Sequence, residues 1–334
     1  MRILVTGANG FVGGALCRYF MQDGRHEIVA AVRKEVSSGT YTARCAVGNI
    51  DQHTSWAHAL KGIDVVVHLA ARAHILRQQR TDSLAAYRSV NTAGTINLAF
   101  QAARAGVRRF IFISSVKVCG EGQSQPGQEA YCEDQLPVPG DAYAVSKWEA
   151  EQGLWGIVET TGMEGVVLRP PLVYGPRVGA NFLRLLGAVD SGLPLPFGKV
   201  DNRRDLIYVG NLVHAVLTCL EHAAARNRTF LLSDGESVST PELIRRVGVA
   251  LNRPARLLRL PAKWLRLAGL FTGKQAALDR LLGSLTVNSG AIRHNLDWSP
   301  PYSMGQGLME TAKWYRARSG AGVFDIALPK YEKR

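Results

Sequence analysis

Apolar residues fall in short unbroken runs along the first half of the chain, and a stretch with helical spacing follows most of them. The runs are rich in Val, Ile and Leu without polar alternation, which is typical of strands covered on both faces. Such strands alternating with helices predict an α/β fold, a Rossmann-type doubly wound parallel sheet. The predicted strands are residues 3–5, 27–32, 45–47, 65–69, 110–114 and 165–169, and the predicted helices are residues 11–22, 54–60, 81–105 and 143–160.

The alternation of predicted strands and helices becomes less regular after Arg169, where prolines become frequent. Residues 239–242 (Ser-Thr-Pro-Glu) form a capping box with proline in the first turn, which predicts a helix up to Leu251. We therefore expect a smaller, interleaved second domain that closes over the first. The first domain is expected over residues 1–171, with segments near 203–223 and 229–234 returning to it, and the second mainly over residues 172–320.

A glycine-rich turn joins the first predicted strand to the first predicted helix. Gly7, Gly10 and Gly13 have the spacing G-x-x-G-x-x-G. Small residues let the backbone approach a phosphate, and the helix amino terminus supplies free N–H groups and a positive dipole. The motif lies between a buried strand and a helix, which is the context it requires. The turn predicts that the first domain binds NAD(P). We therefore expect the second domain to bind the substrate.

Tyr143 and Lys147 lie one helical turn apart and share a helix face. A free phenol has a pKa of about 10, which a nearby ammonium and a positive nicotinamide ring would lower. Ser114 and Ser115 end a strand at the carboxyl edge of the sheet, where ligands bind. A tuned phenol beside a dinucleotide predicts proton transfer coupled to hydride transfer at a carbinol or carbonyl carbon.

The end of the second strand bears on which dinucleotide is bound. Proteins that read an unmodified adenosine ribose place Asp or Glu there, whereas this chain has Arg33 and Lys34 after Val32. A cation at this position would pair with a 2′-phosphate. The sequence therefore favours NADP(H), and NAD(H) remains open.

Composition narrows the class of protein. The chain has 334 residues, 46% of them hydrophobic and 20% charged, which is enough for a large core in about two domains. The net charge is +13, but the basic residues are dispersed and carry no nucleic-acid-binding signature, so we expect an anionic small molecule rather than a nucleic acid. Five scattered cysteines form neither a disulfide framework nor a metal-ligand pattern, which favours the cytoplasm.

No run of 18 apolar residues predicts a transmembrane segment. Residues 264–271 are apolar with an interspersed Arg266. This segment fits either a helix at a membrane surface or a packed amphipathic helix or dimer surface.

The motifs together resemble the extended short-chain dehydrogenases/reductases, in the family of nucleotide-sugar epimerases, dehydratases and reductases. The resemblance implies a catalytic triad of Ser115, Tyr143 and Lys147, a UDP-sugar substrate and a homodimer formed by a helix pair, for which residues 81–105 and 143–160 are candidates. The matching segments are residues 6–13, 68–71, 91, 112–120, 143–147, 169–175 and 203–211.

The same resemblance implies the other binding residues and no metal. Contacts with the cofactor are implied for Gly7, Asn9, Gly10, Phe11, Val12, Gly13, Arg33, Asn49, Ile50, Leu69, Ala70, Ala71, Asn91, Ser114, Tyr143, Lys147 and Pro170. Contacts with the substrate are implied for Lys117, Asn181, Arg204 and Arg280, the last three at its diphosphate. Arg204 alternatively pairs with Asp201 or Asp205.

Departures from the family pattern reduce the number of reactions that we expect of this chain. Dehydratases of this type carry an Asp-Glu pair after the catalytic hydroxyl residue, where this chain has Val116 and Lys117, so dehydration is not expected. Leu172 replaces a usual Asn, and Cys119 replaces a common Tyr. Because Arg33 favours NADPH, we expect reduction of the 4-keto group of a UDP-4-keto-6-deoxy-N-acetylhexosamine (UDP-N-acetylquinovosamine type) in surface-polysaccharide synthesis. The alternative is a C4 epimerase of UDP-hexoses or UDP-N-acetylhexosamines with tightly bound NAD, and a more remote one is a non-catalytic cofactor- or RNA-binding protein.

Overall fold

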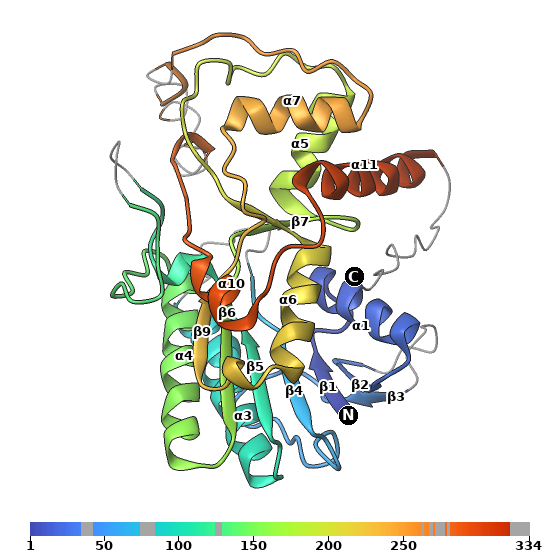
Figure 1. Ribbon diagram of the computed structural model, residues 1–334, viewed down its shortest axis with the longest axis vertical. Helices are drawn as coiled ribbons and strands as arrows, with labels where there is room; N and C mark the ends of the chain where they lie inside the picture. Colours follow the sequence, from blue (N-terminus) through green and yellow to red (C-terminus); the bar gives the residue numbers. More distant parts are fainter. Residues whose placement is uncertain are drawn as a thin grey trace.

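A seven-stranded parallel sheet forms the centre of the molecule, in the order β3-β2-β1-β4-β5-β6-β9 (Figure 1). The computed structural model describes residues 1–34, 43–73, 84–123, 129–261, 264–266, 270, 278 and 281–320. The predicted doubly wound sheet is confirmed. Its strands are β1 (Arg2–Thr6), β2 (Glu27–Val32), β3 (Ala43–Ala46), β4 (Val65–His68), β5 (Arg109–Ile113), β6 (Glu164–Arg169) and β9 (Arg228–Leu231).

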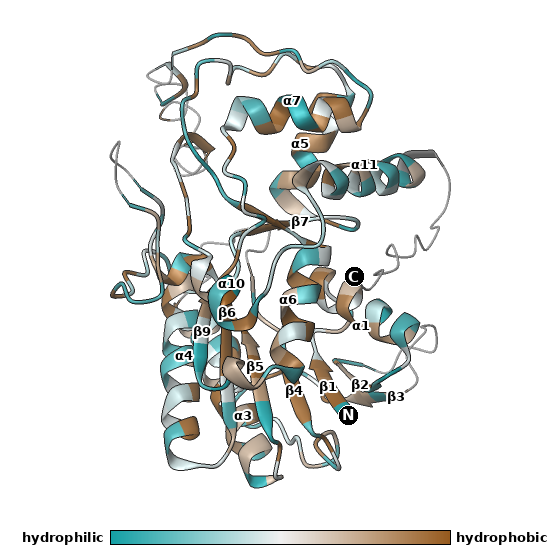
Figure 2. Ribbon diagram, in the orientation of Figure 1, coloured by the Kyte–Doolittle hydropathy of each residue, from teal (hydrophilic) through white to brown (hydrophobic). Residues whose placement is uncertain are grey.

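Helices cover both faces of this sheet. On one face lie α1 (Phe11–Asp23) and α6 (Val209–Glu221), and on the other lie α3 (Gly94–Arg104) and α4 (Ala142–Thr160). The central strands are fully buried and stand out as hydrophobic in Figure 2. Burial on both faces explains why these strands read as unbroken apolar runs.

A second group of elements lies beyond the carboxyl ends of the strands. It contains α5 (Ala180–Asp190), α7 (Thr240–Ala250) and α11 (Met304–Gly320), in the upper part of Figure 1. Beneath them, β7 (Leu172–Tyr174) and β8 (Leu206–Tyr208) pair as a separate two-stranded sheet, and α10 (Gly290–Leu296) packs against β9. At the start of α7, the Ser239 hydroxyl accepts from the Glu242 N–H at 3.2 Å, as expected of the capping box.

Two predicted helices differ from the structure. Residues 54–56 are irregular and residues 57–60 form turns, because the side chains of Asp51 and Thr54 bond to nearby backbone N–H groups and compete with helix formation. In place of one long helix after residue 81, the described residues form α2 (Leu84–Tyr87), a π-helical segment η1 (Arg88–Ala93) and then α3. Apolar periodicity does not reveal a local change in helical pitch.

Of the segment 264–271, which is expected at a membrane surface or in a packed face, the structure describes residues 264–266 and 270. Within it, Leu265 is buried and packs near Val200, whereas Trp264 is exposed. Among the helices that the structure describes, none is long and apolar enough to cross a membrane.

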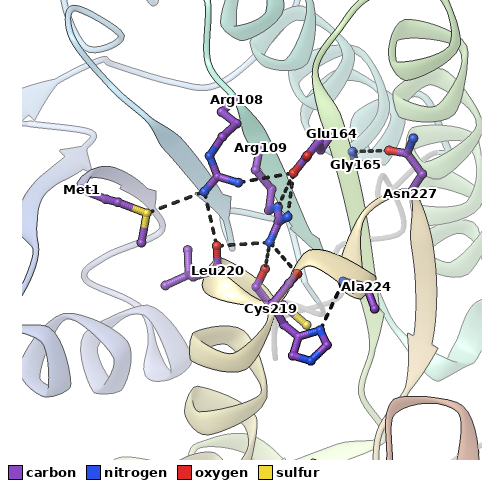
Figure 3. A network of polar contacts seen from close by, with 10 residues as sticks. Met1, Arg108, Arg109, Glu164, Gly165, Cys219, Leu220, Ala224 and Asn227 are labelled. Carbon is purple, nitrogen blue, oxygen red and sulfur yellow. Dashed lines mark hydrogen bonds and ion pairs between the residues drawn. The ribbon is translucent and has the colours of Figure 1, made fainter. Parts of the chain in front are cut away.

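A buried arginine joins the amino-terminal ends of β5 and β6 to the carboxyl end of α6 (Figure 3). Only 2% of Arg109 is exposed. Its Nε donates to Glu164 Oε2 at 2.7 Å, and its Nη1 donates to the carbonyls of Leu220 and His222 at 3.1 Å each. The guanidinium therefore satisfies helix-end carbonyls that have no partner within the helix.

We predict that Arg109→Met lowers the free energy of unfolding by about 3–5 kcal/mol, because it removes the buried partner of Glu164 and of the carbonyls at the end of α6, which the longer contacts of Arg108 replace only in part. Arg108→Met is the matched control, since Arg108 contacts the same two groups from a side chain that is 46% exposed. That variant should lose less than about 1 kcal/mol. Urea unfolding measures both changes, and equal losses would contradict the assigned role of Arg109.

Candidate active site

The glycine-rich turn between β1 and α1 brings three backbone segments into contact. Gly7 has φ +67°, and a Cβ built on it would lie 2.9 Å from the Ala70 nitrogen. A Cβ on Gly13 would lie 2.2 Å from the carbonyl oxygen of Gly7. Both positions therefore require glycine for steric reasons.

The same turn leaves room for a phosphate at the amino end of α1. Gly10 is the N-cap residue and is exposed, with no side chain to cover the helix end. The N–H groups of Phe11, Val12 and Gly13 lie in the first turn, where they have no acceptor within the helix. A glycine cradle at a helix amino terminus fits a dinucleotide pyrophosphate.

A buried hydrogen-bond chain supports the turn from the neighbouring strand. Thr6 Oγ1 accepts from the N–H groups of Leu69 and Ala70 at 3.1 Å each and is 2.7 Å from His68 Nδ1. Burial, with a smaller contribution from the Lys147 charge, lowers the pKa of His68 to about 3. A neutral His68 thus fixes the segment after β4, and Leu69 and Ala70 are partly exposed beside the glycine turn while Ala71 is exposed.

Ser115, Tyr143 and Lys147 are brought together where β5 ends against α4. Ser115 is the second residue after β5 and follows Ser114. A hydrogen bond joins its side chain to Tyr143. The Lys147 ammonium donates to the Ile113 carbonyl at 2.7 Å and lies 4.2 Å from the centre of the Phe112 ring. The serine and tyrosine hydroxyl groups can therefore both hydrogen-bond to the same substrate oxygen.

The pKa values of the two ionisable groups differ from the sequence-based expectation. Burial, and then the negative charge of Asp141, raise the pKa of Tyr143 to about 12, while the hydrogen bond with Ser115 opposes this shift. Burial lowers the pKa of Lys147 to about 7, opposed by Glu151. The protein's own residues thus do not produce the lowered phenol pKa that the i, i+4 spacing predicts, because spacing sets the helix face and not the degree of burial.

Asn91 lies in the π-helical segment and ties three parts of the site together. Its Oδ1 accepts from the Arg72 N–H at 2.7 Å, and its Nδ2 donates to the Arg72 carbonyl at 3.1 Å and to Ser146 Oγ at 3.0 Å. Ser146 in turn donates to the Tyr143 carbonyl at 2.8 Å. Asn91 is 1% exposed, so its amide serves here as a support for the segment after β4 and for α4.

A buried ion pair lies beneath the catalytic groups. Arg169 Nη2 is 2.6 Å from Glu151 Oε2, and both residues are almost fully buried. The Ser114 hydroxyl donates to the same carboxylate, and Arg169 also contacts the Cys119 sulfur at 3.6 Å. Because burial raises the pKa of the Cys119 thiol, this cysteine is a buried neighbour and not an activated nucleophile.

The remaining expected cofactor residues lie around the carboxyl ends of the strands. Arg33 follows β2 and is exposed, Asn49 is exposed, and Ile50 is partly buried. Pro170 is buried and accepts from the Val116 N–H at 3.0 Å. Asn9 is exposed in the glycine turn.

The four expected substrate residues are not gathered in one place. Lys117 forms an ion pair with Asp141 beside Tyr143. Arg204 is partly buried and donates to the Gly283 carbonyl at 3.0 Å, and burial lowers its pKa. Asn181 is exposed at the start of α5, and Arg280 lies outside the described residues.

Two residues beside Tyr143 were not identified from the sequence. Asp141 caps α4 by accepting from the Ala144 N–H at 2.8 Å. Tyr87 packs edge-to-face on Tyr143, with ring centres 6.3 Å apart. An Asp just before a helix is a recognisable N-cap signal, whereas the contact of Tyr87 depends on the tertiary structure.

Comparisons with known proteins agree with this geometry. Residues 3–232 match the model of the NAD dependent epimerase/dehydratase family. A UDP-glucose 4-epimerase of Vibrio cholerae is 42% identical over 312 residues, which are 93% of this chain and 94% of the relative. An N-acetyl-alpha-D-glucosaminyl-diphospho-ditrans,octacis-undecaprenol 4-epimerase of Escherichia coli O157:H7 is 27% identical, covering 93% of this chain and 94% of that protein.

Solved structures share the fold. The UDP-glucuronic acid 4-epimerase of Bacillus cereus, in complex with UDP-glucuronic acid and NAD, has a TM-score of 0.76 at 23% identity. The match covers 95% of this chain and 100% of the other.

We predict that Gly13→Ala weakens NAD binding at least about 100-fold, or about 2.8 kcal/mol, because the new methyl group would displace the Gly7 carbonyl and open the cradle. Gly156→Ala is the control, since a Cβ at Gly156 meets nothing within 4 Å and this helix position should favour alanine. Calorimetric titration with NAD measures both, with circular dichroism as a check of folding. A folded Gly13→Ala protein with unchanged affinity would contradict the assignment.

Proposed function

The chain belongs to the NAD dependent epimerase/dehydratase family, and from this premise we propose that it is a UDP-hexose C4 epimerase that retains NAD. The Ser115–Tyr143 pair beside buried Lys147, at the same edge of the parallel sheet as the glycine turn, is the observation that carries the proposal. The 42% identity with a UDP-glucose 4-epimerase supports this substrate class.

The residues of the site suit reversible proton transfer at a sugar hydroxyl. Tyr143 would take the proton from the C4 oxygen and later return it, while Ser115 hydrogen-bonds the same oxygen. NAD, when bound, would supply the hydride acceptor and donor for C4. Inversion requires the 4-keto sugar to turn over between the two transfers, so that the hydride returns to its opposite face. The positive charge of its ring, added to Lys147, would lower the phenol pKa that burial holds at about 12. Arg204 would hold the diphosphate after a change of partner from the Gly283 carbonyl.

The expected 4-keto reductase becomes the second candidate. Arg33 favours it, because its exposed cation follows β2 where a 2′-phosphate would lie. The relatives named above favour the epimerase, and Val116 with Lys117 offers no acid–base pair for dehydration in either case. We therefore place epimerisation first, with a role in supplying sugars for surface polysaccharides.

We also propose a cytoplasmic homodimer formed by α3 and α4. Phe100 on α3 is 51% exposed, with the Arg104 guanidinium 5.8 Å from its ring centre, which suits a helix face that packs on another copy. The cysteines are free thiols, which suits a reducing compartment.

The epimerase should interconvert UDP-glucose and its C4 epimer without net change in reduced cofactor, as followed by NMR of the anomeric protons and absorbance of reduced nicotinamide. Tyr143→Phe should slow this reaction about 100- to 10,000-fold and leave NAD affinity nearly unchanged, because only the proton carrier is lost. Tyr315→Phe, in the distant α11, is the control. Steady oxidation of NADPH by a UDP-4-keto sugar, without interconversion, would establish the reductase instead.

Arg33→Asp separates the two cofactors. We expect affinity for NADP(H), relative to NAD(H), to fall at least about tenfold, because a carboxylate would repel the 2′-phosphate and accept from a 2′-hydroxyl. Lys61→Asp, an exposed change in the turn preceding β4, should leave the ratio unchanged. Titration with both dinucleotides measures the ratio, and an unchanged ratio in Arg33→Asp would remove the argument for NADP(H).

A further inference from the structure

An ion pair links the turn that carries Ser115 to the N-cap residue of α4, the helix that carries Tyr143. Lys117 Nζ contacts Asp141 Oδ2, and the two side chains are 24% and 25% exposed. Lys117 is two residues after Ser115, and its N–H donates to Ser115 Oγ at 3.3 Å. Asp141 is two residues before Tyr143. The pair therefore bridges the turn after β5 and the start of α4.

The two oxygens of the Asp141 carboxylate have different tasks. Oδ1 accepts from the Ala144 N–H at 2.8 Å and caps the helix, while Oδ2 faces Lys117. A capping carboxylate this close to Tyr143 places a negative charge beside the group that must become negative when it gives up its proton. The Lys117 ammonium contacts the oxygen that does not serve the cap, so the ion pair and the cap coexist on one carboxylate.

We propose that Lys117 and Asp141 act as a positioning pair: Asp141 fixes the helix turn that holds Tyr143, and Lys117 neutralises the field of Asp141 at the Tyr143 hydroxyl. This role deepens the proposed function, on which it rests, and gives Lys117 a task other than contact with the substrate. Lys117 stands at one of the two positions where a dehydratase carries its acid–base pair, and here it would adjust the charge around the phenol instead.

Other groups also set the environment of Tyr143. In the part of the chain that the structure describes, they come from α4 itself and from the elements packed against it. Ser115 in the turn after β5 and Tyr87 on α2 act on Tyr143 directly. The nearby cations are Lys147, one helical turn later on α4, Lys117 in the turn after β5, and Arg72, whose guanidinium lies 5.9 Å from the centre of the Tyr87 ring.

The test compares pH profiles of kcat for full-length Lys117→Met, Asp141→Asn and the double variant. Asn also caps helices, so Asp141→Asn removes the charge and keeps the cap. Lys117→Met should shift the limb assigned to Tyr143 to higher pH and lower kcat at pH 7 about three- to tenfold. Asp141→Asn should shift it to lower pH, and the double variant should return close to the parent.

Two further variants control for general effects. Lys117→Arg should keep the parental profile, and Lys313→Met, which breaks an ion pair with Glu310 on α11, should not move it. A pair with only a structural role would lower kcat in both single variants without opposite shifts. Parallel shifts, or profiles that superimpose on the parent, would overturn the proposal.

A second measurement distinguishes this proposal from the proposed function. Phenolate absorbance of the NAD complex, with the Tyr143→Phe signal subtracted, reports the titration of Tyr143 without any substrate. Opposite shifts in Lys117→Met and Asp141→Asn would support the pair even if no UDP-hexose reacts. Equal titrations in an active epimerase would overturn the pair and leave the function intact.

Discussion

The hydrogen bond from the Lys147 ammonium to the Ile113 carbonyl fixes the catalytic helix against the sheet. The bond joins the second turn of α4 to Ile113, the last residue of β5. Tyr143 lies one turn before Lys147, and Ser115 lies two residues after Ile113, so the bond holds these two residues side by side. The bond is buried, and there a lost partner is expensive for both groups. This contact therefore helps to fix the placement of the Tyr143 hydroxyl, on α4, relative to the Ser115 hydroxyl, after β5.

Two buried arginines of the described residues are paired with carboxylates. Glu151 with Arg169 supports the site, and Arg109 with Glu164 closes the opposite end of the sheet. Buried pairs of this kind contribute little net stability, but each enforces one arrangement, because removing one partner leaves an uncompensated charge. Lys147 differs from them, since its nearest bond is to a carbonyl and burial brings its pKa to about 7. An ammonium so close to neutrality responds readily to a neighbouring charge.

The same site geometry suits both candidate reactions, C4 epimerisation and 4-keto reduction. A serine and a tyrosine that share one oxygen can remove a proton from a carbinol or deliver it to a carbonyl, so the hydroxyl pair serves an epimerase and a reductase equally. The difference lies in whether the dinucleotide stays bound through the reaction or is exchanged, and in the proposed function the adenosine end of the dinucleotide bears on this choice. Arg33 follows β2, whereas the catalytic hydroxyl groups lie near β5, so Arg33 bears on the choice of reaction only through the proposed cofactor preference.

The sequence by itself determined the layered sheet, the glycine turn and the pairing of Tyr143 with Lys147 on one helix face. These features depend on residues close together in the chain, where apolar runs and helical spacing act directly. Only the tertiary structure decided that burial raises the pKa of Tyr143, that Lys117 faces Asp141, and that residues 88–93 form a π-helical segment around Asn91. Each of these depends on groups far apart in sequence, and desolvation and charge contacts are set only when the elements pack together.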